Sequence, residues 1–473
     1  MHPPTRIRAR AGVAAAAALA AALVATPASA HPGKSADGGE ELWVNPKSSI
    51  TEHLRTEHLK GQDRADAEAL AGYASASWFT GGTPSEVRKD VRDQVRRADR
   101  ADAVPTLVAY NLPYRDCAQY SAGGAASQAD YEEWIDAFAA GIGNERAIVI
   151  LEPDGLGVIP WYTTIDGAQE WCQPEDADPA TAAAERFAMF NHAVDAFGAL
   201  PNAQVYLDAG NSAWLNVGEN TDRLIKAGVQ RADGFFLNAS NYQFTENSTA
   251  YGHWISSCIE VITRGLGAAA DCGNQYWNGG PANDWTGVAM TRYAPWTAGN
   301  ADPAADTSGV DSKYAQQLGD IVPTTQFVID TSRNGVGPWD PTTSDVEYTG
   351  DAEDWCNPPD RGLGARPTLD VDDPLVAGYL WIKVPGESDG QCYRSLGGPL
   401  DPERGMQDPA AGQWFAEQAR ELIELAVPPL ETTRADCRGK GKGNGSADAN
   451  GKGQANGKGN AGGNGHGQGH GGV

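Results

Sequence analysis

The segment 148–154, with the sequence IVILEPD, constrains the fold of this chain more than any other. Its four consecutive apolar residues, mostly β-branched, predict a strand buried on both faces, as in a parallel sheet. The strand ends at two carboxylates, Glu152 and Asp154, and burying a charge is costly unless the charge is paired or functional. Parallel α/β barrels place their active-site residues at the carboxyl ends of their strands. The segment therefore predicts an α/β fold with an acidic site at the end of this strand.

Six further apolar segments run into a polar residue or a glycine-rich turn. They are Ala74–Phe79, Thr106–Tyr110, Gln204–Leu207, Gly234–Leu237, Gln326–Ile329 and Ala377–Ile382, and the residues that follow them are Thr80, Asn111, Asp208, Asn238, Asp330 and Lys383. Between them, apolar residues at helical spacing predict helices at Asp130–Gly141, Ala182–Leu200 and Ala411–Leu425. Alternating strands and helices predict parallel strands joined by right-handed crossovers. Because polar residues close nearly every strand, we expect a ring of about seven strands around one mouth, a β/α barrel, rather than an open doubly wound sheet with a single crevice.

The two ends of the chain are not expected to join this fold. Residues 1–30 contain arginines, an apolar run from Ala11 to Val24 and a small-residue cleavage site, the pattern of a secretory signal peptide. A membrane anchor is the weaker alternative, because the run is short for a span of roughly 20 residues. Residues 439–473 are mostly Gly, Lys, Asn, Ala and His, which predicts a disordered tail. We therefore expect a secreted, extracellular protein in which residues 41–430 form a single catalytic domain.

Charge and cysteine content narrow the choice of partners and ligands. The net charge of −26 argues against nucleic acid and anionic membranes as partners. Seven cysteines in an exported chain predict three disulfides and one unpaired cysteine, for which Cys437 beside the tail is the candidate. No C-x-x-C pair is present, and His466 and His470 in the tail offer a weak metal site at most. No metal centre is predicted.

Asp154 is the strongest candidate for a catalytic residue. A carboxyl group just past a buried strand is partly desolvated, which raises its pKa and keeps its proton near neutral pH. A leaving group needs such an acid. Asp208, in the segment YLDAGNSAW at 206–214, also follows a strand but fits an ordinary strand-end cap equally well.

Two more loops carry acidic residues. The segment VAYNLPYRDCAQYSAGG at 108–124 places Asp116 beside Arg115 after a predicted strand, although taken alone this pair fits a surface turn better. The segment WIKVPGESDG at 381–390 places Glu387 and Asp389 on a glycine-bounded loop near Lys383, where a solvated loop is the alternative.

Tryptophans flank these acidic segments, namely Trp214, Trp355 and Trp381. Aromatic faces stack on the C–H surfaces of sugar rings, although core packing is the ordinary explanation for any one tryptophan. Tryptophans beside several acidic loops, in a chain expected to be secreted, favour glycoside hydrolysis by paired carboxylates.

Taken together, these segments resemble glycoside hydrolase family 6, the cellulases with a distorted, partly open β/α barrel. VAYNLPYRDCAQYSAGG and IVILEPDGLG match the family signatures, and YLDAGNSAW, VIDTSRNG, DWCN and WIKVPGESDG follow the same order. The resemblance covers about residues 42–430. It implies hydrolysis of β-1,4-glucosidic bonds with inversion and without a cofactor. An inverting pair of carboxyl groups stands roughly 6.5–9.5 Å apart to admit a water.

The resemblance also implies roles for individual residues. Asp154 aligns with the proton donor, Asp116 with the acid that raises the donor's pKa, and Asp389 with the disputed catalytic base. Arg115 is expected to hold the first two acids in place. Residues expected in sugar-binding or supporting positions are Tyr110, Arg115, Asp208, Asn211, Trp214, Asn238, Trp355, Lys383 and Glu387. The family's two disulfides match Cys117–Cys172 and Cys356–Cys392.

Three departures from the family pattern stand out. Asn211 occupies a position where many members carry histidine, which puts its sugar contact in doubt. Gly155 stands where serine or alanine is commoner, which implies a looser turn after Asp154. Cys258 and Cys272 are additional, and the stretch DCGNQYWNGGPANDW at 271–285 is an added segment. We expect these two cysteines to pair with each other.

The sequence therefore predicts a monomeric, secreted β-1,4-glucanase that acts on cellulose and related β-glucans. Endo action is favoured, because the stretch between Asp389 and Trp414 is short compared with the covering loop of exo-acting members. The alternatives are an exo-acting cellobiohydrolase, a carbohydrate-binding protein that does not hydrolyse, and an adhesin that acts through its tail. The three carboxylates Asp154, Asp116 and Asp389 argue against the carbohydrate-binding protein, because binding alone needs no desolvated acid.

Overall fold

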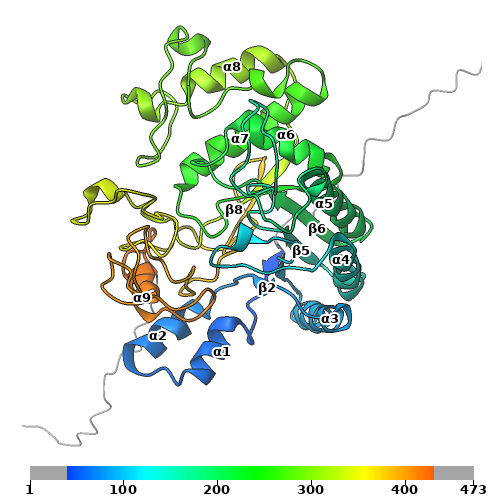
Figure 1. The fold of residues 1–473 in the computed structure, drawn as a ribbon, viewed down its shortest axis with the longest axis vertical. Helices are drawn as coiled ribbons and strands as arrows, with labels where there is room; N and C mark the ends of the chain where they lie inside the picture. Colours follow the sequence, from blue (N-terminus) through cyan, green and yellow to red (C-terminus); the bar gives the residue numbers. More distant parts are fainter. Residues whose placement is uncertain (1–39, 431–473) are drawn as a thin grey trace, which may run out of the picture. The chain divides into compact units, whose positions relative to one another are not determined.

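Seven parallel strands form one curved sheet, which confirms the predicted β/α architecture (Figure 1). In spatial order they are β2 (Ser77–Phe79), β4 (Thr106–Ala109), β5 (Ala147–Leu151), β6 (Ala203–Asp208), β7 (Gly234–Leu237), β8 (Gln326–Asp330) and β9 (Val376–Leu380). Every segment predicted as a strand overlaps one of them, with ends that differ by up to three residues. The structure is a computed structural model that describes residues 40–430. The expected signal peptide, the tail and Cys437 lie outside the described residues.

The sheet curls until its two edge strands almost meet. Ala76, just before β2, donates its backbone N–H to the carbonyl of Trp381, just after β9, over 2.9 Å. The Trp78 indole N–H donates to the carbonyl of Ile382 over 2.8 Å. No strand ladder joins β2 to β9 in the described part of the chain, so the barrel is distorted and partly open, as the family resemblance implies.

The two faces of the strands fill two separate layers of core, because successive side chains of a strand point to opposite sides. The barrel interior holds residues such as Val108, Ile148, Ile150, Tyr206, Phe236 and Val328. The alternate residues, such as Leu107, Val149, Leu151 and Leu207, pack outward against the helices. This double burial explains why β5 is apolar at every position.

Helices cover the outer face of the sheet (Figure 1). They are α3 (Pro84–Arg100), α4 (Gln128–Ile142), α5 (Ala182–Gly198), α6 (Val217–Ala227), α7 (Thr245–Thr263) and α8 (Ser308–Leu318). A smaller cluster joins α1 (Ser49–Thr56), α2 (Gly61–Leu70) and α9 (Ala416–Glu424) around Trp381 and Trp414. A separate short pair, β1 (Glu41–Leu42) and β3 (Ala103–Val104), was not predicted. Within residues 40–430, no helix has the length and apolar character needed to cross a membrane.

The three predicted helices are present as α4, α5 and α9, and local chemistry sets their ends. Ser127 caps α4 by accepting the backbone N–H of Asp130. The helix predicted to start at Ala411 begins instead at Ala416, because the backbone of Phe415 is still extended, with φ of −121° and ψ of 91°.

Three disulfides confirm all the expected pairings. Cys117–Cys172 joins the loop after β4 to the loop after β5, and Cys356–Cys392 joins the segment before β9 to the loop after it. Cys258–Cys272 ties the added segment back to α7. Cys117–Cys172 and Cys356–Cys392 therefore fix loops at the carboxyl ends of the strands.

Candidate active site

The loops at the carboxyl ends of the strands enclose a cavity of about 840 Å³. Ten of the predicted site residues line it, namely Tyr110, Arg115, Asp116, Asp154, Asn211, Trp214, Trp355, Lys383, Glu387 and Asp389. Asp208 and Asn238 are buried and do not line it. The three candidate catalytic carboxylates reach the cavity from the loops after β4, β5 and β9. The structure thus brings together residues that lie far apart in the sequence.

Asp154 stands on a tight turn directly after β5. Both Glu152 and Asp154 have left-handed backbones, with φ of +56° and +62°. A Cβ added at Gly155 would lie 2.8 Å from the Glu152 carbonyl oxygen and 2.8 Å from Leu112 Cδ1. Glycine therefore allows this turn to pack tightly against the β4 loop. The looser turn that the family comparison implied is wrong for this chain.

The surroundings of Asp154 favour its protonated form. The carboxyl group is partly exposed to the cavity, but the protein around it removes most of its solvent. This desolvation raises the pKa of Asp154 well above its ordinary value, and the negative charges of Asp208, Asp116 and Asp389 raise it further. A carboxyl group with these neighbours retains a proton that it can donate.

Asp208, at the end of β6, supports the Asp154 turn from within the protein. Its Oδ2 accepts the backbone N–H groups of Leu156 and Gly157 over 3.0 and 3.1 Å, and its Oδ1 accepts that of Gly210 over 3.0 Å. Its side chain is fully enclosed, so it cannot contact a sugar in the cavity. Of the two roles implied by the resemblance, the geometry fits the supporting one.

Glu152 and Arg186 link the same turn to the β4 loop. Glu152 accepts the backbone N–H groups of Asn111 and Leu112 over 2.9–3.1 Å, and burial raises its pKa to about 7. Arg186, from α5, donates to three carbonyl oxygens, those of Pro113, Gly155 and Val158. The loops that carry Asp116 and Asp154 are therefore bonded together beneath the cavity.

The Arg115 side chain holds the Asp116 loop by bonding to backbone carbonyl groups. Its guanidinium donates to the carbonyl oxygens of Thr80, Tyr110 and Ser121 and lies 4.6 Å from the centroid of the Tyr110 ring. Within the described residues, no hydrogen bond or ion pair joins Arg115 to Asp116 or Asp154. Arg115 thus fixes the loop and the Tyr110 ring rather than bonding to the acids directly.

Asp116 itself is held by the loop that it begins. Its Oδ2 accepts the backbone N–H of Ser121 over 2.8 Å, and its own backbone is left-handed with φ of +56°. Burial raises the pKa of the Asp116 carboxyl, and the Ser121 hydrogen bond and the Arg115 charge oppose this rise. Its charge in turn raises the pKa of Asp154.

The pKa of Asp389 is shifted in the opposite direction to that of Asp154, because positive charges surround Asp389. Its Oδ2 accepts from Arg333 Nη1 over 2.8 Å and from the Tyr242 hydroxyl over 3.2 Å, and Lys383 Nζ lies 3.3 Å from its Oδ1. Burial alone would raise the pKa of Asp389, but Arg333 and Lys383 outweigh it and hold the pKa below its ordinary value. The surroundings therefore shift the pKa values of Asp154 and Asp389 in opposite directions, the pattern expected of an acid–base pair.

Sequence reasoning missed Arg333, Tyr242 and Asn357 as partners of Asp389. Arg333 follows β8 within the quoted segment VIDTSRNG, so its place after a strand was a usable signal. Asn357 lies in the quoted segment DWCN, and its backbone N–H donates to Asp389 Oδ2 over 3.0 Å. What the sequence did not show is which carboxylate these residues would meet.

Asn357 also connects Asp389 to a buried pair of aspartates. Its Oδ1 accepts the Asp389 backbone N–H over 2.8 Å, and its Nδ2 donates to Asp408 Oδ2 over 2.9 Å. Arg394 donates to both oxygens of Asp401 over 2.8 Å. Burial raises the pKa of Asp408 to about 7, and the neighbouring Asp401 contributes to this rise. These contacts hold the Asp389 loop from outside the cavity.

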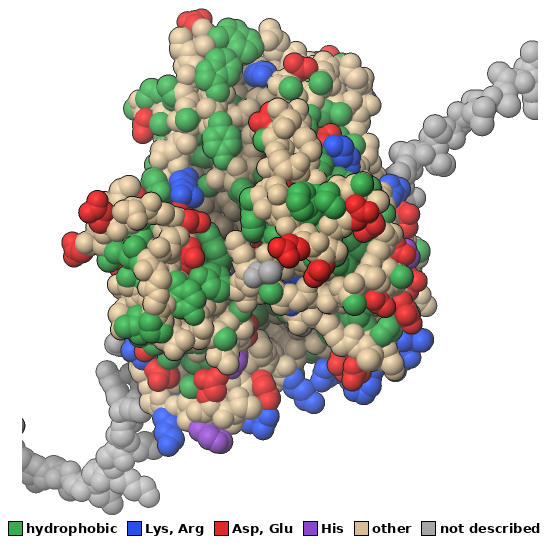
Figure 2. Space-filling view, in the orientation of Figure 1, with side chains coloured by type: hydrophobic (Ala, Val, Ile, Leu, Met, Phe, Trp, Pro, Cys, Tyr) green, Lys and Arg blue, Asp and Glu red, His purple; other side chains and the backbone are tan. Residues whose placement is uncertain are grey.

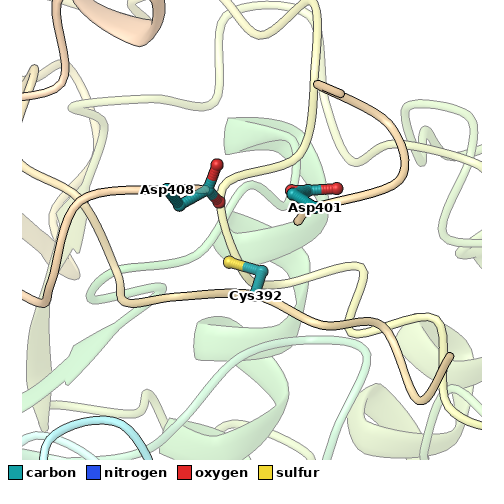
Figure 3. A group of neighbouring side chains, drawn as sticks. All are labelled: Cys392, Asp401 and Asp408. Atoms are coloured by element: carbon teal, nitrogen blue, oxygen red, sulfur yellow. The ribbon is translucent and has the colours of Figure 1, made fainter. Parts of the chain in front are cut away.

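Figure 3 shows Cys392, Asp401 and Asp408, whose possible ligand atoms lie within 4.8 Å of one another. The Cys392 sulfur is bonded to Cys356, and both oxygens of Asp401 pair with Arg394. This leaves the Asp408 carboxyl group, whose Oδ1 has no hydrogen-bond partner in the described part of the chain, as the one available ligand of the three. One ligand does not hold a metal ion, so the group fits a structural role.

Aromatic side chains form much of the cavity wall. They include Trp78, Tyr110, Tyr120, Trp171, Trp214, Tyr242 and Trp355. Gly157 lies against the Trp214 ring, where an added Cβ would approach a ring carbon to 2.3 Å. Trp381, which also flanks an acidic segment, is fully buried and belongs to the core.

The remaining predicted polar residues are also fixed by local contacts. Asn211 Oδ1 accepts the backbone N–H of Ala213 over 3.0 Å, which turns the Trp214 loop. Glu387 lies 3.5 Å from Nε2 of His53 on α1, and this contact raises the pKa of His53. Asn238 is buried at the end of β7 and donates to the Asp330 carbonyl, so it supports the strand ends.

Comparison with known proteins agrees with this geometry. The chain matches the sequence model of the family described as glycosyl hydrolases family 6 over residues 37–426. Endoglucanase A of Thermobispora bispora is 31% identical over 418 residues, which cover 88% of this chain and 69% of the relative. A probable 1,4-beta-D-glucan cellobiohydrolase C of Neosartorya fischeri is 28% identical over 82% of this chain and 78% of its own length. The solved endoglucanase Cel6 of Mycobacterium tuberculosis, in complex with a methyl-cellobiosyl-thio-cellobioside, is 30% identical, with a TM-score of 0.56 over 82% of this chain and 98% of that one.

Proposed function

The chain belongs to glycosyl hydrolase family 6, and we propose from this premise that it hydrolyses β-1,4-glucosidic bonds of cellulose and related glucans with inversion. One observation carries the proposal, namely that Asp154 and Asp389 line the same cavity in opposite surroundings: burial and neighbouring carboxylates raise the pKa of Asp154, whereas Arg333 and Lys383 lower that of Asp389. The two acids have the same intrinsic chemistry, so their neighbours assign the roles. Inverting hydrolysis needs one group to donate a proton and another to receive one.

In the proposed mechanism, Asp154 gives its proton to the glycosidic oxygen as the bond to the sugar breaks. Positive charge develops on the sugar ring, and the nearby carboxylate of Asp116 stabilises it. A water attacks from the opposite face, and its proton passes to Asp389 directly or through a second water. Because Asp389 has a lowered pKa it is a weak base, which suffices for a water that becomes acidic as it attacks.

The substrate class follows from the cavity wall. Trp214 and Trp355 line the cavity, and we assign them as platforms on which sugar rings stack. Lys383 and Glu387 supply charged groups for sugar hydroxyls. The related proteins named above are an endoglucanase, a probable cellobiohydrolase and an endoglucanase bound to a cellobioside derivative, which supports a β-1,4-glucan as the substrate.

Replacing Asp154 tests the assignment of the acid. In Asp154→Asn we expect kcat on cellotetraose to fall about 10²–10⁴-fold, because general acid catalysis contributes about that factor. Cellotetraose binding, measured by calorimetry, should stay within about threefold, since the amide keeps the shape of the side chain. Asp320→Asn, an exposed residue just before β8 at the other end of the strands, serves as the control. Turnover near that of the unmodified protein in Asp154→Asn would contradict the assignment.

We further propose endo action, on the grounds of the short stretch between Asp389 and Trp414. The viscosity of a soluble cellulose derivative should then drop steeply for each new reducing end. A slow loss of viscosity per bond cleaved would favour the exo alternative.

NMR of the first product formed should show the α-anomer, and a β-anomer would refute inversion.

The cellular setting is part of the same proposal. Residues 41–430 would form a single catalytic domain that is exported and acts as a monomer. Three disulfides within the described residues support an oxidising compartment.

A further inference from the structure

The added segment between α7 and α8 exposes aromatic side chains that the cavity does not use. Tyr276, Trp277, Trp285 and Tyr293 have exposed fractions of 50%, 44%, 49% and 39%. Figure 2 shows hydrophobic side chains on the surface at the top of the view, over the part of the fold that contains α8 in Figure 1. Contiguous exposed apolar surface on a soluble protein commonly marks an interaction site. We call these four residues the aromatic ledge.

Two of these rings stack on each other. The rings of Trp277 and Trp285 are nearly parallel, with an interplanar angle of 20° and 6.3 Å between their centroids. Glycines make room for Trp277, since a Cβ at Gly279 would lie 2.4 Å from its ring and one at Gly287 would lie 2.7 Å away. Trp277 therefore packs on backbone while much of its ring stays exposed. Flat apolar rings of this kind suit the C–H faces of pyranose sugars.

The segment that carries the ledge is held in place by buried contacts. The disulfide Cys258–Cys272 fixes its start to α7. Asn278, which is buried, donates to the carbonyls of Pro303 and Asp306 and accepts the backbone N–H of Val288. A rigid aromatic surface loses little conformational freedom when it binds, so more of the contact free energy is retained as affinity.

The ledge is continuous with the cavity. Tyr276 donates its hydroxyl to the Trp214 carbonyl over 2.6 Å, and the buried Gln275 donates to the Leu215 carbonyl over 2.9 Å. Both bonds reach the loop that carries Trp214, a lining residue of the cavity. Arg292, seven residues after the added segment, itself lines the cavity and forms an ion pair with Asp354, next to Trp355. Tyr276 therefore lies directly beside the loop that carries Trp214.

We propose that the aromatic ledge is an accessory binding surface for a β-glucan chain that extends beyond the cavity. This inference rests on the proposed function, because it takes the same polymer as ligand. Short oligosaccharides that fill the cavity do not reach the ledge, whereas long chains do. The ledge would thus supply affinity for polymer within the catalytic domain itself.

The test compares polymer and oligosaccharide in one pair of variants. In Trp277→Ala/Trp285→Ala we expect retention by a long soluble β-glucan, measured by affinity electrophoresis, to weaken roughly five- to tenfold, because each aromatic contact contributes a factor of a few. The kcat/KM on cellotetraose should stay within about twofold. Trp277→Phe/Trp285→Phe keeps flat rings and should restore most of the retention. Val322→Ala, an exposed apolar residue just before β8, is the control and should change neither quantity.

Several outcomes would overturn the inference. One is polymer retention that does not change in Trp277→Ala/Trp285→Ala. If retention is unchanged and the oligomeric state shifts on size-exclusion chromatography, the ledge is a self-association surface instead. A parallel loss on polymer and cellotetraose with a lowered melting temperature would show a structural role only. If the unmodified protein neither binds nor cleaves glucans, the proposed function fails first, and that result is distinct from a failure of the ledge.

Discussion

At the scale of single residues, Arg333 decides the state of Asp389. Its guanidinium is fully buried, pairs with Asp389 and stacks over the Tyr242 ring at 4.3 Å from the ring centroid. A buried ion pair contributes little net stability by itself, but removing one partner leaves a buried charge without compensation. The ionised state of Asp389 thus depends on a residue that no substrate needs to touch.

Replacing this arginine should change both stability and pH dependence. In Arg333→Met we expect the free energy of unfolding at neutral pH to fall by about 3–5 kcal/mol, the usual effect of breaking a buried pair. The pKa of Asp389 should rise, so the acid limb of the kcat/KM profile on cellotetraose should move to higher pH.

The sign of the stability change provides a second check. A carboxylate whose folded pKa is lowered stabilises the protein above its unfolded pKa, and this stabilisation is lost as the pH falls through the folded pKa. The deficit of Arg333→Met should therefore be largest near neutral pH and shrink on acidification. Arg420→Met, which removes a partly exposed ion pair with Asp63, should cost less than about 1 kcal/mol. An acid limb that does not move would refute the role of Arg333.

Several residues of the site could be predicted because each follows a strand. This rule placed Asp154, Asp208 and Lys383 at one end of the sheet from periodicity alone. It could not separate cavity residues from supporting ones, since Asp208 and Asp154 follow similar segments and differ only in which backbone groups surround them. It also could not pair Arg333 with Asp389, because they are 56 positions apart and meet only through the sheet.

At the scale of elements, the turn after β5 combines three constraints. Two left-handed residues reverse the chain, Asp208 accepts its backbone N–H groups, and Gly155 lies against the β4 loop. The position of Asp154 is therefore set by contacts from two neighbouring strands. Small displacements of a catalytic group reduce the rate strongly.

A single methyl group should disturb this turn. In Gly155→Ala the new Cβ would meet the Glu152 carbonyl oxygen at 2.8 Å, and backbone cannot move aside as a flexible side chain can. We expect a loss of about 1–3 kcal/mol in the free energy of unfolding, as for other overpacked sites, and a tenfold or larger drop in kcat. Chemical denaturation and cellotetraose turnover measure the two effects.

Gly198→Ala is the matched control. It lies at the end of α5, where a Cβ would meet its nearest neighbour, the Arg231 carbonyl oxygen, at an ordinary 3.6 Å. Alanine is the better helix former, so this change should leave activity intact and stability equal or higher. If Gly155→Ala behaved like Gly198→Ala, the tight packing of the turn would not matter for catalysis.

The strands were more predictable than their connections. Continuous apolar runs such as 148–151 are visible in sequence because both faces of β5 are buried. The added segment at 271–285 has no periodic pattern, since glycines and buried amides such as Asn278 define it, and its fold follows from long-range hydrogen bonds. Sequence alone identified its disulfide but not its contact with the Trp214 loop.

At the scale of the whole molecule, disulfides hold regions that the sheet does not. Cys258 and Cys272 are 14 positions apart, and the bridge connects the ledge segment to the helical layer. Closing a loop of this length restricts the unfolded chain and stabilises the fold by about 3 kcal/mol in the chain-entropy model.

Removing this bridge should lower stability without removing the active site. In Cys258→Ser/Cys272→Ser we expect the free energy of unfolding to fall by about 2–4 kcal/mol, measured in denaturant under oxidising conditions. Cellotetraose turnover should remain, because none of the three candidate catalytic carboxylates lies on this segment. Equal stability of the variant and the unmodified protein would show that hydrogen bonds alone hold the segment.

The periodicity of the sequence could not predict how far the barrel closes. The seam depends on contacts between the two ends of the sheet, the Ala76–Trp381 hydrogen bond and the Trp78 indole. Periodicity gives strand number and direction, whereas closure depends on how far seven strands curl. Only the family resemblance indicated a partly open form.

The left-handed backbones at Asp116, Asp154 and Asn238 also bear on the history of the chain. Each such residue costs roughly 1 kcal/mol or more that glycine would not incur. Mutation and drift under selection for folding alone would favour glycine at these positions. The Asn238 side chain offsets this cost by bonding to Gln243 and Asp330, whereas at Asp116 and Asp154 glycine would remove a carboxyl group from the cavity wall.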